Sequence, residues 1–194
     1  HCKTRRQRQM CIRDRLNMKN VYSKGMFENV CLAIKVALDL NIDKKVIQKT
    51  LPLLSFEGRF QYLNKGKIKN KLNRNELIMI DGAHATADAQ NLASYLKKIK
   101  IPKYGIWAMT KNKDPDLFIK QLKGIFKKII TMPIENEISS VSAQELYKVA
   151  TENKFNVEKS DNFAQALKKI SSKEKKLIVC FGSLYNCGNI LNKN

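Results

Sequence analysis

Short apolar runs alternate with amphipathic segments along most of the chain. The runs predict strands that are buried on both faces, at 77–80, 104–109, 128–132 and 177–181. Apolar residues at helical spacing predict helices between and after these strands, at 92–99, 115–122, 142–149, 162–170 and 184–191. This alternation predicts an α/β fold with a mainly parallel sheet and helices on both of its faces.

The chain before this region has a helical pattern. Apolar residues fill most positions of 28–40 and predict a helix that is strongly buried when its packing partners are present. Without those partners, we expect 30–40 to expose apolar surface. Asp43 can cap a second, short helix that runs to about Leu51 and that Pro52 closes.

Two segments link the helix pair to the alternating region. The segment 56–63 predicts a strand entered through a glycine, and the lysine- and asparagine-rich segment 64–75 predicts a solvated hairpin or loop. We expect the hinge at 52–58. The chain thereby divides into a helical part, 16–56, and an α/β part, 57–194.

The first fifteen residues form a segment of a different kind. Residues 1–15 have no periodicity and carry six basic residues against one aspartate. The string from Met10 to Asp14 is what ATG-TGT-ATA-AGA-GAC encodes, which looks like a transposase-type sequencing adapter. We interpret 1–15 as a non-native tail and leave it out of the fold prediction.

The formal net charge of +20 raises nucleic acid as a partner. After the tail, however, only Arg59 and Arg74 are arginines, and lysine is spread along the chain with abundant asparagine and isoleucine. These are residues of A/T-rich codons, and the guanidinium groups that dominate base recognition are scarce. We therefore expect no nucleic-acid partner.

The cysteines and the hydropathy exclude other classes. The five cysteines form no CxxC pair and do not cluster with the two histidines, so no metal site is predicted. Cys31, Cys180 and Cys187 lie in apolar contexts and are predicted to be reduced core residues of a cytoplasmic protein. No apolar run is long enough for a membrane span.

Polar residues follow the predicted strands, where a parallel sheet binds ligands. Asp81 and His84 follow the first strand, Lys113 follows the second, and Ser183 follows the last. A carboxylate, an imidazole, a lysine and a hydroxyl at helix starts can bind nucleotide and anions. Ordinary alternatives are helix caps for Asp81 and Ser183, a solvated loop for Lys113, and a surface position for the rare Arg59.

The order of these motifs is more specific than any one of them. Gly58–Gln61 (Gly-Arg-Phe-Gln), Asp81–His84 (Asp-Gly-Ala-His), Lys113–Pro115 (Lys-Asp-Pro) and Val179–Tyr185 (Val-Cys-Phe-Gly-Ser-Leu-Tyr) follow one another along the chain. This order resembles the C-terminal part of bacterial folylpolyglutamate synthase/dihydrofolate synthase, in the Mur ligase superfamily. The resemblance covers roughly 29–191.

The resemblance implies an ATP- and Mg²⁺-dependent, ADP-forming amide ligase. Such an enzyme activates the carboxylate of dihydropteroate or a folate as an acyl phosphate, which the amino group of L-glutamate then attacks. It implies a Rossmann-like C-terminal domain at 57–194, preceded at 16–56 by a remnant of the central ATP-binding domain. It also implies a monomer that has no membrane partner.

The resemblance also implies roles for individual residues. Asn29 resembles the central-domain asparagine that contacts adenine, and Arg59 resembles an arginine that reaches ATP on domain closure. Asp81 resembles an aspartate that binds the nucleotide, with His84 beside it at the reacting centre. Two further residues resemble positions that hold the carboxylates of the incoming glutamate, namely Lys113 and Ser183.

The chain departs from the family pattern in three places. Glu57 replaces a proline, and Ala85-Thr86 replaces the usual Asn-Pro after the histidine. No GxxxxGK[ST] phosphate loop is present, and the family's Mg²⁺ ligands and modified lysine lie in the upstream domain. We therefore expect this chain to be inactive by itself.

Two other functions fit the same residues. One is a Mur-type ligase that joins a different amino acid to a different carboxylate. The other is a non-catalytic, basic α/β module that binds nucleotide or RNA, for which affinity would fall steeply with salt.

Overall fold

A computed structural model defines residues 18 and 20–194 of the chain. The predicted non-native tail, 1–15, lies outside the described residues. The chain divides into two compact units at the boundary between Phe56 and Glu57. Over the described residues, no helix combines the length and the apolar character that a bilayer crossing requires.

The described part of the first unit is helical. Its elements are α2 (Lys24–Asp39), α3 (Lys44–Thr50) and the 3₁₀ helix η1 (Leu51–Leu53). Ser23 caps α2 and Asp43 caps α3, because each side chain accepts a hydrogen bond from a backbone N–H group in the first turn. The predicted cap at Asp43 is therefore confirmed.

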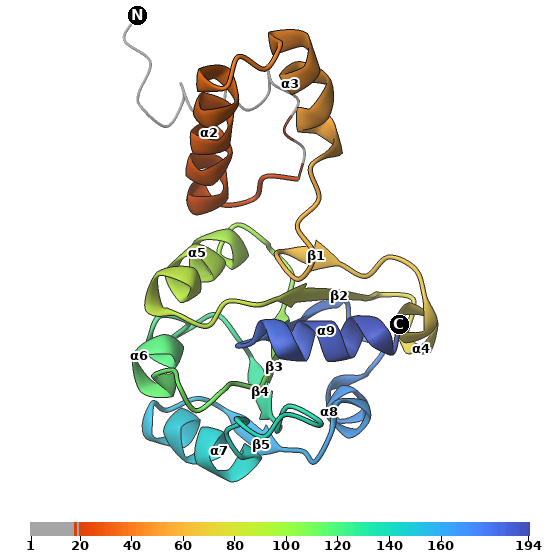
Figure 1. Ribbon diagram of the computed structural model, residues 1–194. Coiled ribbons are helices and arrows are strands. Elements are labelled where there is room, and N and C mark those ends of the chain that lie inside the picture. Colours follow the sequence, from red (N-terminus) through yellow and green to blue (C-terminus); the bar gives the residue numbers. More distant parts are fainter. Residues whose placement is uncertain (1–17, 19) are drawn as a thin grey trace, which may run out of the picture. The chain divides into compact units, whose positions relative to one another are not determined.

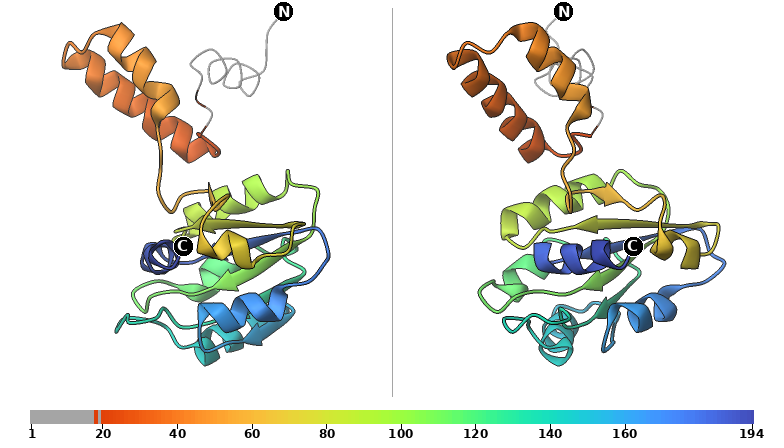
Figure 2. Two further views of the ribbon diagram at one scale, coloured as in Figure 1. Left: turned by 90° about the vertical axis from the view of Figure 1, so that its right-hand side faces the viewer. Right: turned by 45° about the vertical axis from the view of Figure 1, so that its right-hand side comes forward.

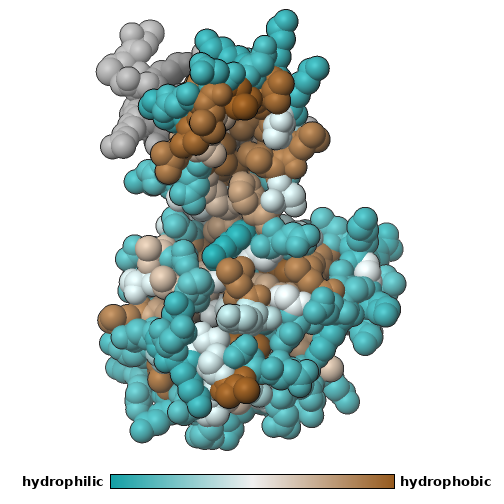
Figure 3. Space-filling model, in the orientation of Figure 1, coloured by the Kyte–Doolittle hydropathy of each residue, from teal (hydrophilic) through white to brown (hydrophobic). Residues whose placement is uncertain are grey.

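Most apolar side chains of the first unit are exposed. The small core of this unit contains four buried residues: Met18, Val21, Val30 and Leu51. Leu32, Val36 and Leu40 on and after α2 are 64%, 49% and 68% exposed, and apolar residues gather on the face of this unit that Figure 3 shows. The burial predicted for 28–40 is not present in this unit, because two short helices offer too little surface to cover it, and the expected exposure of apolar surface at 30–40 is confirmed.

The second unit is built on a six-stranded sheet. Its strands are β1 (Gln61–Tyr62), β2 (Glu76–Asp81), β3 (Lys103–Trp107), β4 (Lys128–Thr131), β5 (Val157–Lys159) and β6 (Lys176–Phe181). The strand order is β1-β2-β6-β3-β4-β5, in which only β1 pairs antiparallel to its neighbour (Figure 1). The predicted α/β fold with a mainly parallel sheet is confirmed.

Helices cover both faces of this sheet (Figure 2). The helices are α4 (Lys67–Lys71), α5 (Thr86–Leu96), α6 (Pro115–Lys120), α7 (Ala143–Glu152), α8 (Phe163–Ile170) and α9 (Leu184–Asn192). On one face, Ile78, Ile106 and Ile178 pack with α4, α8 and α9. On the other face, α5, α6 and α7 follow one another, and Trp107 stacks on Phe118 of α6.

Some predicted elements differ from the observed ones. The strand predicted at 56–63 is reduced to β1, because Gly58 and Phe60 adopt positive φ angles of 66° and 48° and form a turn. The predicted loop at 64–75 contains α4, and β5 was not predicted because its sequence Val-Glu-Lys has a single apolar residue.

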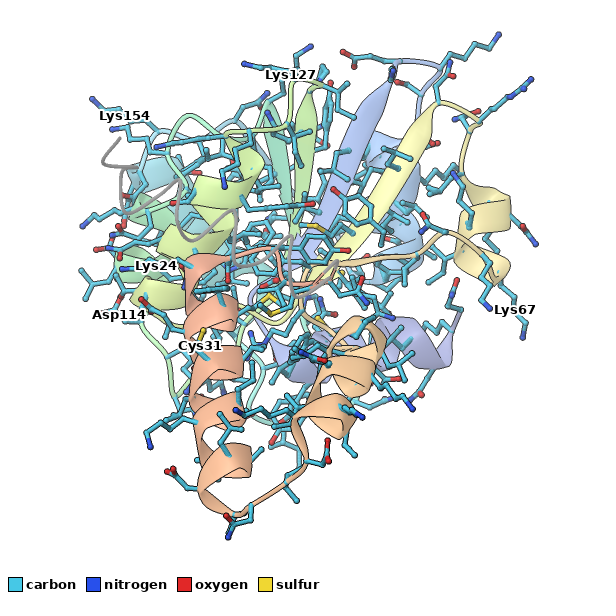
Figure 4. The ribbon with its side chains drawn as sticks, turned by 90° about the horizontal axis from the view of Figure 1, so that it is seen from above. Lys24, Cys31, Lys67, Asp114, Lys127 and Lys154 are labelled. Carbon is cyan, nitrogen blue, oxygen red and sulfur yellow. The ribbon has the colours of Figure 1, made fainter. Side chains whose placement is uncertain are left out.

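Several lysines of the second unit point outward, and the free cysteines of the two units differ in burial. Lys67, Lys127 and Lys154 project outward from separate segments of the second unit (Figure 4). Cys180 and Cys187 are buried free thiols, as predicted, whereas Cys31 on α2 is exposed. The prediction for Cys31 is wrong for the same reason as the burial of its helix.

Candidate functional site

Three strands end side by side at one edge of the sheet in the second unit. Asp81 at the end of β2 and Trp107 at the end of β3 both pair with Phe181 at the end of β6. The segments that follow these strands therefore leave the sheet next to one another, at the edge where parallel sheets bind ligands. They carry His84, Lys113 and Ser183, which the sequence predicts as site residues.

Glycines allow these segments to lie in close contact. A Cβ atom on Gly82 would lie 2.3 Å from Cδ2 of Leu184, the first residue of α9. A Cβ atom on Gly182 would lie 2.3 Å from the carbonyl oxygen of Ala108, and Gly182 has a φ of +107°. The turns after β2, β3 and β6 thus form one packed group.

The side chain of Asp81 connects the turn after β2 to an earlier segment of the chain through hydrogen bonds. Its side chain is buried, with 2% exposure. Oδ2 accepts a hydrogen bond from the backbone N–H of Phe60 at 2.8 Å, and Oδ1 accepts one from that of Ala83 at 2.8 Å. The N–H of Gly82 also donates to the carbonyl oxygen of Gly58 at 2.7 Å. Asp81 therefore holds the Gly58–Gln61 segment, which carries Arg59, against the turn after β2.

The protonation of Asp81 reflects its burial. Burial raises the pKa of Asp81 from 3.8 to about 6, although the two N–H donors and the Arg59 guanidinium favour the charged form. The Asp88 carboxylate adds a small contribution in the same direction as burial. The group is thus poised to change charge in mildly acidic solution.

Aromatic residues support the turn that carries Arg59. Phe60 packs edge-to-face on Tyr95 of α5, with ring centroids 4.9 Å apart, and the hydroxyls of Tyr62 and Tyr95 are 3.0 Å apart. Within the turn, the Gln61 side chain accepts a hydrogen bond from the N–H of Gly58 at 2.8 Å. The sequence pattern does not single out Tyr95, because this residue fits the apolar face of the helix predicted at 92–99.

His84 has a defined tautomer. Its Nδ1 lies 2.9 Å from the carbonyl oxygen of Gly82. A carbonyl only accepts hydrogen bonds, so in the neutral ring Nδ1 carries the proton and Nε2 has the lone pair. The half-buried ring can therefore accept a proton or a hydrogen bond at Nε2.

The other two predicted residues of this unit follow β3 and β6. Lys113 is half-buried in the loop after β3, and its N–H donates to the carbonyl oxygen of Thr110 at 3.3 Å. Ser183 is buried and caps α9, because its Oγ accepts a hydrogen bond from the N–H of Tyr185 at 3.1 Å.

Two buried nitrogens at this edge lack a partner. Among the buried side chains of the described residues, Trp107 Nε1 and Asn186 Nδ2 are the polar atoms that make no hydrogen bond. Trp107 Nε1 lies 3.0 Å from the position of a Cβ on Gly182, and Asn186 lies in the first turn of α9. Unpaired donors beside a helix N-terminus suit an anionic ligand, and the sequence did not indicate either residue.

The remaining predicted site residue, Asn29, lies on α2 in the first unit. It is exposed and borders an apolar groove. In the part of the chain that the structure describes, no three His, Cys, Asp or Glu side chains are grouped as a metal ion requires.

The second unit matches a known protein family. Residues 64–193 match the model of the dihydrofolate synthetase C-terminal domain. The chain belongs to this family. The resemblance on which the sequence prediction rests is therefore confirmed. No curated protein sequence matches the chain.

Solved structures of related enzymes share the fold of this dihydrofolate synthetase domain. Folylpolyglutamate synthase of Mycobacterium tuberculosis, complexed with ADP and AMPPCP, is 18% identical with a TM-score of 0.75, covering 89% of this chain and 40% of that chain. FolC of Escherichia coli, in complex with DHPP and ADP, is 18% identical with a TM-score of 0.69, covering 88% and 39%. The bifunctional enzyme of Yersinia pestis, complexed with AMPPNP and Mn ion, is 17% identical with a TM-score of 0.70, covering 88% and 39%.

The chain thus spans about 40% of the length of these enzymes. At these identities, the likeness shows the fold of the dihydrofolate synthetase domain and not its substrates. The residues at the edge of the sheet fit part of a nucleotide and anion site, because they offer a guanidinium, a lysine and helix N–H groups.

Proposed function

We propose that this chain is the C-terminal part of an ATP-dependent, ADP-forming ligase that adds L-glutamate to dihydropteroate, to folyl-glutamate, or to both. The substrate carboxylate attacks the γ-phosphorus of ATP, which gives an acyl phosphate and ADP. The glutamate amino group then attacks the acyl carbon, and phosphate leaves as the amide forms. Mg²⁺ supplies charge neutralisation at the phosphates, and we expect its ligands upstream of this chain.

The family match over 64–193 is the observation that carries this proposal. The geometry of the second unit supports it in one further respect. The residues that the sequence implicates in this unit follow strand ends that are paired in register, or lie on the turn that Asp81 holds.

In this proposal, Arg59 binds the phosphates of ATP. Asp81 orders the turn that carries Arg59, since both of its oxygens accept backbone N–H groups on that turn or on its own. Each oxygen keeps a second lone pair, which leaves Asp81 able to accept a nucleotide hydroxyl as well. His84 accepts a hydrogen bond or proton from the attacking amine at Nε2.

Lys113 and Ser183 bind the carboxylates of the incoming glutamate in this proposal. The lysine provides a charge after β3, and the cap of α9 provides a hydroxyl and helix N–H groups after β6. Two anions, the acyl phosphate and glutamate, must meet at this edge, and closure against water prevents hydrolysis of the acyl phosphate.

We assign the first unit to the ATP-binding central domain, with Asn29 as its adenine contact and 52–58 as the hinge. The groove that Asn29 borders has a volume of about 310 Å³ and is almost entirely apolar. Such a surface is typical of a domain interior that further chain covers. In the complete protein, we expect the upstream part of the central domain to pack there.

We also place the enzyme in the cytoplasm as a monomer. The buried cysteines of the second unit are free thiols, which is the usual state in a reducing compartment.

The test is a ligation assay on the protein of the complete reading frame. We expect ADP and a glutamylated product only when ATP, L-glutamate and a folate or dihydropteroate are all present. The chain 1–194 assayed in parallel should give neither. ADP formation with another amino acid but not with glutamate would instead identify a different Mur-type ligase.

A further inference from the structure

Residues of α4, α8 and the end of α9 line a groove on the second unit. Figure 1 shows where these three helices lie. Its volume is about 530 Å³, within the range of small-ligand sites. Ile68, Phe163 and Leu167 are buried residues that line it. The floor of the groove is therefore apolar.

Lysines from three elements border this groove. Lys71 ends α4, Lys168 lies on α8, and Lys193 follows α9, and all three are exposed. The one acidic residue that lines the groove, Glu135, forms an ion pair with Lys193. Lys71 and Lys168 thus give the rim an excess of positive charge, which favours anionic ligands.

The groove extends along α8 from one edge of the sheet to the other. At its first end, the N–H of Phe163 donates to Oε1 of Glu135, which follows β4 at the carboxyl edge. At its other end, the hydroxyl of Ser171 lies 3.1 Å from Oε2 of Glu76, the first residue of β2. The groove therefore begins at the edge that carries the candidate site and leads away from it.

We propose that this groove binds the oligo-γ-glutamate tail of a folate, a chain of carboxylates separated by methylene groups. The proposal rests on the proposed function, which supplies glutamate polymers as product. The methylenes would pack on Ile68, Phe163 and Leu167, while the carboxylates would pair with Lys71 and Lys168. A bare polyphosphate would leave the apolar floor uncovered, so a carboxylate chain with a methylene spacer fits the groove better.

The test measures binding of N-acetylated oligo-γ-L-glutamate, without any pterin, to the chain 1–194 by nuclear magnetic resonance. We expect chemical shift changes at Ala164 and Leu167. The variant Lys71→Gln/Lys168→Gln should weaken binding about fivefold, as loss of two exposed ion pairs would do. Ala164→Trp should block the groove without removing charge.

The control variant removes two lysines from elsewhere in the same unit. Lys123→Gln/Lys148→Gln changes the net charge equally but lies outside the groove, on and near α6 and α7, and should leave binding unchanged. Equal weakening by both double variants, or equal affinity for an oligothymidylate of matched charge, would overturn the proposal. The proposal would also be overturned if the oligomer bound without chemical shift changes in α8.

Failure of this proposal can be distinguished from failure of the proposed function. The ligation assay on the complete protein measures addition of one glutamate to dihydropteroate or to a folate with a single glutamate. Neither substrate carries an oligoglutamate tail, so this step does not need the groove. Ligation without binding of the oligomer would overturn the groove alone. Binding without ligation would overturn the proposed function and leave the groove as an oligocarboxylate site.

Discussion

The carboxylate of Asp81 accepts a hydrogen bond from the backbone N–H of Phe60, 21 residues earlier in the chain, at 2.8 Å. Through this bond, one buried side chain fixes two segments of the candidate site. The segment 58–61 carries Arg59, and the turn after β2 carries His84. The family resemblance implies that Asp81 binds the nucleotide, which stays a prediction, and the structure shows that its side chain holds these two segments together.

Replacement Asp81→Asn should loosen this arrangement. An asparagine amide can accept only one of the two backbone N–H groups and faces the other with its NH₂ group. An unpaired buried N–H costs roughly 1–3 kcal/mol, so we expect a loss of that size in the free energy of unfolding measured with urea at pH 4, where the Asp81 carboxyl is uncharged in the folded protein. Asp114→Asn is the control, because asparagine caps α6 as well as aspartate does and should change stability little.

Stability should depend on pH through Asp81. The pKa of Asp81 is about 6 in the folded protein and 3.8 without burial, so the folded state binds the proton more tightly. This contribution is fully present below pH 3.8 and is lost as the pH rises through 6, by about 3 kcal/mol in total. The unfolding free energy of the wild type, minus that of Asp81→Asn, should fall by this amount between about pH 4 and 7. If the difference between the two unfolding free energies did not change with pH, the burial of Asp81 would be contradicted.

Gly182→Ala should destabilise the protein more than Gly124→Ala. Both glycines have positive φ angles, of 107° and 75°, so an alanine is strained at either position. Only at Gly182 would the new Cβ also lie 2.3 Å from a backbone oxygen, whereas nothing lies within 4 Å at Gly124. Thermal unfolding should show a loss of roughly 1 kcal/mol at Gly124 and a clearly larger one at Gly182. Equal losses would show that the turns after β3 and β6 are less closely packed.

The opposite edge of the sheet depends on a buried ion pair. Lys176 Nζ lies 3.7 Å from Oε1 of Glu76, and both side chains are almost fully buried. Glu76→Gln would leave the lysine charge uncompensated, at a cost of roughly 3–5 kcal/mol in chemical denaturation. The ion pair of Lys128 and Glu158, whose side chains are 21% and 48% exposed, is the comparison, and Glu158→Gln should cost at most about 1 kcal/mol. Similar losses in the two variants would contradict this difference in burial.

The alternation of strands and helices in the second unit could be predicted because each buried strand is a short apolar run. The helices predicted at 115–122 and 142–149 begin where expected, and the side chains of Asp114 and Ser142 cap them by accepting hydrogen bonds from the first turn. The turn at 58–60 could not be predicted, because the positive φ of Phe60 depends on contacts with Asp81 and Tyr95, which are distant in the sequence. The pattern at 28–40 gave the helix but not its exposure, because burial depends on which other elements pack against it.

Parts of the candidate site were predictable for a similar reason. Asp81 and Ser183 directly follow or end apolar runs, so their place at the carboxyl edge follows from the strand pattern. Trp107 and Asn186 could not be predicted as site residues, because an unpaired buried nitrogen depends on packing in three dimensions. The roles of all these residues in binding stay predictions.

In the proposed function, this chain is part of a ligase that activates a carboxylate with ATP before joining it to glutamate. The most direct measurement uses dihydropteroate or folate labelled with ¹⁸O in the reacting carboxylate, together with ATP, L-glutamate and the protein of the complete reading frame. One ¹⁸O atom should appear in the inorganic phosphate for each amide formed, because phosphate leaves with a carboxylate oxygen. Amide formation without ¹⁸O in phosphate, or no glutamate-dependent amide at all, would contradict the account.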